Sequence, residues 1–173
     1  VAGRYYAATR EGDTIWLLPD DAIAPTLPAG THNILVCASN NSSRTAFDVT
    51  TGELVIDHLP PTADVVDVVP DPRTSSVAEI TIVFSEPIYG LDVADLALSC
   101  DGAIVPLGSG QAPTTLNQIT WSVPNLTELT RRAGHYVLTV ISAGSGITDV
   151  AGNEMVANAS DAWTTHSTVR SEE

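Results

Sequence analysis

The sequence of 173 residues contains no lysine, so all seven of its basic residues are arginines. Against 21 acidic residues, these leave a formal net charge of -14 at pH 7. A charge of this sign repels nucleic acid and anionic membrane surfaces, so we expect neither as a partner. The absence of lysine also excludes a Lys–Asn isopeptide crosslink. We expect most carboxylates to form solvated acidic faces, and a few could bind a cation such as Ca²⁺.

Long apolar runs, aromatic residues and cysteines are also scarce. No segment approaches the roughly 20 apolar residues of a membrane helix, so no membrane insertion is expected. The two cysteines, Cys37 and Cys100, lie far apart and predict no disulfide framework. No secretory signal is visible, but Val1 is not an initiator residue, which is consistent with processing. A hydrophobic content of 43% still indicates a folded chain with a core.

The segment 79–90, EITIVFSEPIYG, shows the strand pattern most plainly. Ile80, Ile82 and Phe84 fall on one face of an extended chain, which is typical of a half-buried strand. Pro87 ends the segment, because proline cannot donate to a sheet. Comparable strands are predicted at 4–9, 14–18, 30–39, 46–57, 65–69, 77–84, 96–100, 103–107, 119–123, 134–142 and 161–165. Asp101-Gly102 predicts a two-residue hairpin turn between 96–100 and 103–107. No window has sustained helical periodicity, so the predicted class is all-β.

The order of these strands predicts two domains. Residues 58–62, HLPPT, form a short, stiff linker, after which the strand pattern restarts. Residues 63–173 contain enough strands for a complete β-sandwich, with Trp121, Phe84, Tyr136 and Leu138 in its core. Residues 1–58 contain about four strands, which is fewer than the roughly seven of an immunoglobulin-like sandwich. The first domain is therefore expected to be partial.

Several segments of the second domain together resemble a known family. They are VVDVVPDPR, ITIVFSEPIYGLDVADLALSCDG, LTRRAGHYVLTV and GSGITDVAGNEM. They resemble the bacterial Ig-like modules that are repeated in very large secreted and surface proteins. The resemblance implies tandem Ig-like β-sandwiches and a structural, spacer or adhesion role outside the cell, and it implies no reaction.

The first domain is similar to the rear part of another such module, through YYAAT, TIWLLP, LPAGTHNILVCAS and TTGELVID. The resemblance implies that its two opening strands are missing. His32 stands where the family usually has a corner tyrosine, a place that Tyr136 takes in the second domain. Residues 39–43 depart from the Asp-Ala-Ala-Gly-Asn turn of the family, so no ligand role is assigned to them. An uncovered apolar face in this domain predicts self-association.

The segment DVAGNE at 149–154 is the best candidate for a binding site. Asp149 and Asn153 can present oxygen atoms from one tight loop, and Ca²⁺ requires six to eight such ligands. Glu86 and Asp71 could add carboxylates. The alternative interpretation is that Asp149 and Asn153 only hydrogen-bond the backbone of their own turn.

No catalytic arrangement is visible in the sequence. The four histidines stand singly, without the spacing of a zinc site. Asp92 is better explained as the cap of a single helical turn than as an acid–base group. Glu86 and Asp92 could imitate a glycosidase pair, but such pairs occur in most acidic proteins. We therefore expect a protein that is not an enzyme.

Three functions remain compatible with the sequence. The first is a structural or adhesion module pair of an extracellular bacterial surface or matrix protein, stiffened by calcium. Its partners would be other Ig-like modules of the same or a neighbouring chain, surface glycans or proteins. The second is a carbohydrate-binding accessory module of a secreted enzyme, and the third is a fibre subunit that assembles by strand donation.

Overall fold

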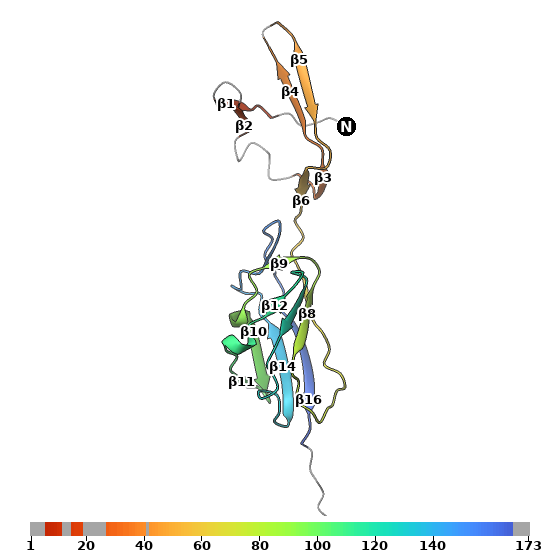
Figure 1. Cartoon of the computed structure of the whole chain (residues 1–173), viewed down its shortest axis with the longest axis vertical. Helices are drawn as coiled ribbons and strands as arrows, with labels where there is room; N and C mark the ends of the chain where they lie inside the picture. Colours follow the sequence, from red (N-terminus) through yellow and green to blue (C-terminus); the bar gives the residue numbers. More distant parts are fainter. Residues whose placement is uncertain (1–5, 12–14, 19–26, 41, 168–173) are drawn as a thin grey trace, which may run out of the picture. The chain divides into compact units, whose positions relative to one another are not determined.

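The computed structural model describes residues 6–11, 15–18, 27–40 and 42–167. The chain divides into two compact units, Val1–His58 and Leu59–Glu173 (Figure 1). Within the described residues, regular structure consists of β-strands and two short 3₁₀ helices, η1 (Val93–Asp95) and η2 (Ser109–Gln111). The predicted all-β class is confirmed. None of the described helices is long and apolar enough to span a bilayer.

The second unit is an Ig-like sandwich of two antiparallel four-stranded sheets. The first sheet has the order β12-β13-β8-β7, and its strands are Thr114–Thr115, Thr120–Val123, Ile80–Phe84 and Ala63–Val65. The second has the order β11-β10-β14-β16, and its strands are Ala103–Val105, Leu96–Cys100, Gly134–Val140 and Ala159–Thr165. A short additional pair joins β9 (Ile88–Tyr89) to β15 (Thr148–Asp149).

The core of this unit lies between the two sheets. Alternation along β8 buries Ile80, Ile82 and Phe84, which confirms the face predicted from the sequence. The opposite sheet contributes Leu98, Tyr136, Leu138, Val140 and Trp163, all at most 2% exposed. Burial of large apolar side chains on both sheets is what holds such a sandwich together.

Trp121 differs from its prediction as a full core residue. It is only partly buried and packs against the edge of the core. The indole nitrogen donates to the carbonyl oxygen of Gln118 at 3.1 Å. A polar ring atom that bonds a nearby turn keeps the indole at the margin, and Trp163 fills the centre instead.

Two local predictions in this unit are confirmed. Asp92 caps η1, because its carboxylate accepts a hydrogen bond from the amide of Ala94 at 2.6 Å. Asp101 and Gly102 form the two-residue turn between β10 and β11, and both have positive φ angles, 52° and 78°. That combination is the backbone requirement of a tight hairpin of this kind.

The first unit has a different organisation. Its strands are β1 (Thr9–Glu11), β2 (Ile15–Leu17), β3 (Gly30–His32), β4 (Leu35–Ser39), β5 (Thr45–Val49) and β6 (Leu54–Ile56). They form three separate two-stranded sheets, β1-β2, β3-β6 and β4-β5. The predicted strands at 30–39 and 46–57 are thus each divided in two. The predicted strand at 4–9 lies partly outside the described residues.

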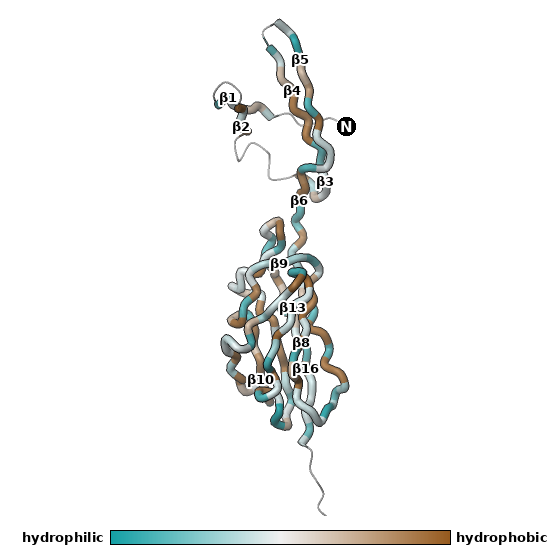
Figure 2. Tube along the Cα trace, in the orientation of Figure 1, coloured by the Kyte–Doolittle hydropathy of each residue, from teal (hydrophilic) through white to brown (hydrophobic). Residues whose placement is uncertain are grey.

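No side chain is buried in the described part of the first unit. The register of the β4–β5 hairpin places Leu35 opposite Val49 and Cys37 opposite Phe47, so all four share one face. Figure 2 shows apolar residues along this hairpin. Phe47 is 66% exposed and Val49 is 61% exposed. A β-hairpin with an open apolar face lacks a covering layer on that face.

Candidate metal centre

The turn after β15 is built around the Asp149 side chain. One carboxylate oxygen, Oδ1, accepts a hydrogen bond from the Asn153 amide at 2.8 Å, and Oδ2 accepts one from the Asn153 side-chain nitrogen at 2.8 Å. The backbone closes the same turn, since the amide of Asp149 donates to the Asn153 carbonyl at 3.1 Å. Gly152 has a φ of 88°, which a residue with a side chain rarely adopts. The sequence thus specifies this turn locally.

A second acidic segment is brought to this turn by the β9–β15 pair. Asp149 is directly opposite Ile88, two residues beyond Glu86. The Glu86 segment is fixed in turn by Ser85, whose amide donates to the Thr62 carbonyl at 2.9 Å. The Thr62 amide donates to the Ser85 hydroxyl at 3.0 Å. As a result, carboxylate oxygens of Glu86 and Asp149 lie within 4.8 Å of one another.

The electrostatics of the pair favour a cation. Asp149 is only 2% exposed, and Glu86 is half-buried. Burial raises the pKa of Asp149, but hydrogen bonds from Asn153 and from the backbone of the turn outweigh it and hold that pKa below its usual value. Asp149 therefore stays ionised at neutral pH beside a second carboxylate. Two neighbouring negative charges with oxygen donors are the chemistry that a hard divalent cation neutralises.

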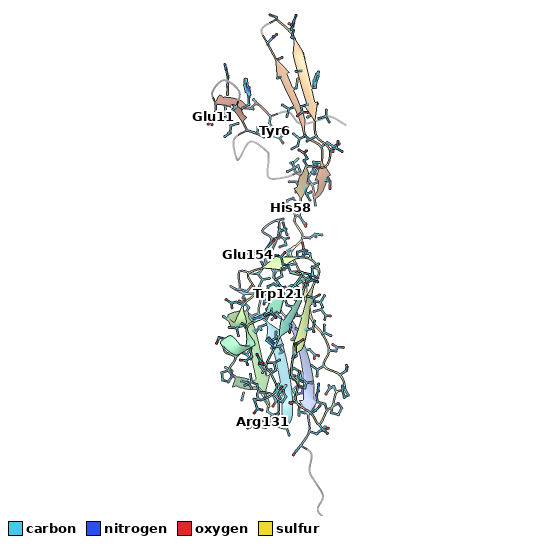
Figure 3. The ribbon with its side chains drawn as sticks, in the orientation of Figure 1. Tyr6, Glu11, His58, Trp121, Arg131 and Glu154 are labelled. Carbon is cyan, nitrogen blue, oxygen red and sulfur yellow. The ribbon has the colours of Figure 1, made fainter. Side chains whose placement is uncertain are left out.

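The four residues named from the sequence do not all meet. Asp149, Asn153 and Glu86 lie at one end of the second unit, near Glu154, and Arg131 lies at the opposite end (Figure 3). Asp71 is not part of this cluster. Its carboxylate accepts a hydrogen bond from the Thr164 amide at 2.8 Å, near the end of β16. The Pro-Asp-Pro turn thus ties a loop to the edge of the sheet.

The structure also supports the local role of Asp149 and Asn153 in their own turn. Asn153 holds Asp149 through two hydrogen bonds, as the alternative interpretation expected. These contacts use the backbone and side-chain nitrogen atoms of Asn153. The carboxylates of Glu86 and Asp149 would supply part of a calcium shell, and further oxygen donors would supply the rest.

Several other aspartates of this unit also hold the backbone through their side-chain oxygens, a role that the composition did not reveal. Five further aspartates accept a hydrogen bond from a backbone amide through a side-chain oxygen. They are Asp71, Asp92, Asp95, Asp101 and Asp161. Several acidic residues expected on solvated faces therefore fix loops and turns instead. Carboxylates suit this task because a charged acceptor strengthens the hydrogen bond.

Comparisons with known proteins add little to this description. No family model matches the sequence, and no curated protein sequence matches it. A search of solved structures returns the crystal structure of the titin domains Z1Z2 in complex with telethonin, at 10% sequence identity. The match covers 95% of this chain and 82% of that chain, with a TM-score of 0.32. At this score the likeness carries no functional conclusion, and the fold rests on the strand pairing described above.

Proposed function

We propose that the chain is a non-enzymatic structural module pair of an extracellular bacterial surface or matrix polypeptide. The observation that carries this proposal is the path of the chain through the second unit. The backbone enters beside β9 and reaches the end of β16 at the opposite end of the same sandwich (Figure 1). A module with its two ends at opposite poles can be joined in series and transmit tension along its length. The resemblance of its segments to repeated Ig-like modules supports the same role.

Backbone hydrogen bonds at the end of β16, the last strand of the second unit, would resist such tension. An isolated bridge pairs Arg73 with Thr165, near the end of β16. The Arg73 amide donates to the Thr164 carbonyl at 2.9 Å, and the His166 amide donates to the Arg73 carbonyl at 2.7 Å. The free edge of the last strand is thereby covered by the loop that follows β7. Covered edges also keep repeated β-modules from pairing with one another.

Single-molecule pulling on the full chain tests the structural role. We expect one cooperative high-force event from the second unit. The first unit, which buries no described side chain, should extend at low force. Asp71→Ala together with Arg73→Pro should lower the force of the main event, because these substitutions remove the carboxylate that accepts from the Thr164 amide and the amide that donates to the Thr164 carbonyl. Unfolding of the second unit at low force in the unsubstituted chain would overturn the proposed structural role.

We further propose that Glu86 and Asp149 hold Ca²⁺ at one end of the second unit. A cation that binds only the folded state raises the melting temperature by mass action. We expect millimolar calcium to raise the melting temperature relative to chelator, and Glu86→Gln to abolish the rise. Glu128→Gln is the matched control, because Glu128 is 76% exposed and pairs with Arg131 far from the site. If calcium raises the melting temperature of both variants equally, the proposed calcium site is wrong.

A further inference from the structure

A wide groove lies on the second unit, away from the acidic turn. It has a volume of about 670 Å³ and is formed by β8, β12, β13 and the loop 115–120. Its lining residues are Glu79, Thr81, Thr114, Thr115, Leu116, Asn117, Thr120, Trp121 and Ser122. None of these residues belongs to the proposed cation site. Concave surfaces with convergent polar groups are the usual places for small ligands.

The floor of this groove is a row of hydroxyl groups across three strands. Ser122 on β13 is directly opposite Thr81 on β8 on one side and opposite Thr114 on β12 on the other. Residues in register share a face of the sheet, and neighbouring strands are about 4.8 Å apart. Within the described part of the chain, none of the three hydroxyls has a hydrogen-bond partner. The row therefore presents regularly spaced groups that can both donate and accept.

The wall of the groove is held in place before any ligand arrives. The Asn117 side-chain oxygen accepts hydrogen bonds from the amides of Ile119 at 3.1 Å and Thr120 at 2.8 Å. The Thr115 hydroxyl donates to the Thr120 carbonyl at 2.7 Å. Leu116 stands fully exposed at the rim. A preorganised wall lowers the entropic cost of binding, and an apolar rim residue can cover the C–H face of a ligand.

The charge of the groove restricts the class of ligand that can bind there. Glu79 is the single ionisable residue in the lining, and it forms no ion pair with another described residue. The groove is thus negative, without a basic group to bind phosphate, sulfate or carboxylate. From this combination we infer that the groove binds neutral oligosaccharides. Their hydroxyls match the row of Thr81, Ser122 and Thr114, and the Glu79 carboxylate can accept further hydrogen bonds.

Backbone amide chemical shifts of the full chain, followed by NMR, test this inference. The probes are neutral gluco-, manno-, galacto- and xylo-oligosaccharides, with an oligohexuronate as the anionic arm. We expect saturable shifts at residues 79–81 and 114–122 with at least one neutral probe at millimolar concentration. We expect none with the hexuronate, because the Glu79 carboxylate repels it.

The substitutions Thr81→Val and Ser122→Ala together should abolish these shifts, because they remove two hydroxyls with little change of shape. The matched control is Thr139→Val with Ser160→Ala, since these two residues form the same kind of cross-strand pair on the other sheet. Melting temperatures of both double variants confirm that the fold is retained. The inference is overturned if no neutral probe shifts the groove residues, if the groove variant binds as well as its control, or if the hexuronate binds equally.

Discussion

The aromatic rings of Tyr136 and Trp163 stack in the centre of the second unit, with centroids 5.4 Å apart and planes 10° from parallel. The two residues are opposite each other on β14 and β16. The Tyr136 hydroxyl reaches back to donate to the Arg132 carbonyl at 2.9 Å, four residues upstream. This pair links the packing of two strands to the loop that precedes one of them.

We predict that Trp163→Ala destabilises the second unit far more than Trp121→Ala. Trp163 is fully buried, and truncating such a residue costs about 3–5 kcal/mol of unfolding free energy. Trp121 is partly exposed at the edge of the core, so its loss should cost less than half as much. Denaturant unfolding of both variants measures the difference. Equal losses would mean that the stacked pair is not the centre of the core.

A second prediction concerns the titration of Tyr136. Burial, together with the neighbouring Cys100 thiol, raises the pKa of its phenol to about 12. Its unfolded pKa is near 10, so the folded state retains the proton more tightly. The resulting stability is fully present below pH 10 and is lost as the pH rises through about 12. Ultraviolet absorbance should show one late-titrating tyrosine, absent in Tyr136→Phe. A late phase that persists in this variant would contradict the assignment.

Local sequence patterns predicted much of the second unit. The alternation in 79–84, the Asp101-Gly102 turn and the Asp92 cap are decided by neighbouring residues, and all three occur as expected. The position of Trp121 was not predictable in the same way. Its strand pattern points inward, but its burial depends on where the sheet ends and on the contact with Gln118.

In the candidate metal centre, too, the local contacts were predictable from the sequence and the long-range contacts were not. The hydrogen bonds within the Asp149 turn are local and follow from the sequence. The approach of Glu86 is not local, because it depends on two strands of two residues each, in which Tyr89 pairs with Thr148, 59 positions away, and Ile88 pairs with Asp149, 61 positions away. Strands this short carry no periodicity. The prediction that Asp71 joins the other carboxylates failed for the same reason. Its side chain instead accepts a hydrogen bond from an amide of β16, which is far from it in the sequence.

We predict that Asp149 stabilises the fold in a pH-dependent way. Hydrogen bonds hold its pKa below the ordinary 3.8, despite burial that acts in the opposite direction. A carboxylate with a lowered folded pKa stabilises the protein above its unfolded pKa, and this contribution is lost as the pH falls through the folded value. Asp149→Asn should therefore be less stable than the unsubstituted chain at neutral pH.

Thermal melts between neutral pH and acid, with chelator present, measure this effect separately from any cation. The gap between the two proteins should narrow as the pH falls below about 4. Asp67→Asn is the matched control, because it makes the same substitution at an exposed aspartate of the second unit. A gap that is constant down to the lowest pH would show that the ionised form of Asp149 is not what the turn requires.

The last prediction concerns the apolar face of the β4–β5 hairpin, formed by Leu35, Cys37, Phe47 and Val49. Each large side chain on this face would gain about 1.5–3 kcal/mol if it were covered, so we expect the chain to self-associate as its concentration rises. Phe47→Glu places a charge on this face and should weaken the association at least tenfold, since about 1.4 kcal/mol corresponds to that factor. Ile104→Glu is the control, because Ile104 is 86% exposed on the second unit, outside this face. Light scattering over a concentration series measures the effect, with reductant present because Cys37 is an exposed free thiol. A chain that stays monomeric, with amides of the first unit strongly protected from hydrogen exchange, would mean that this unit buries its hairpin after all.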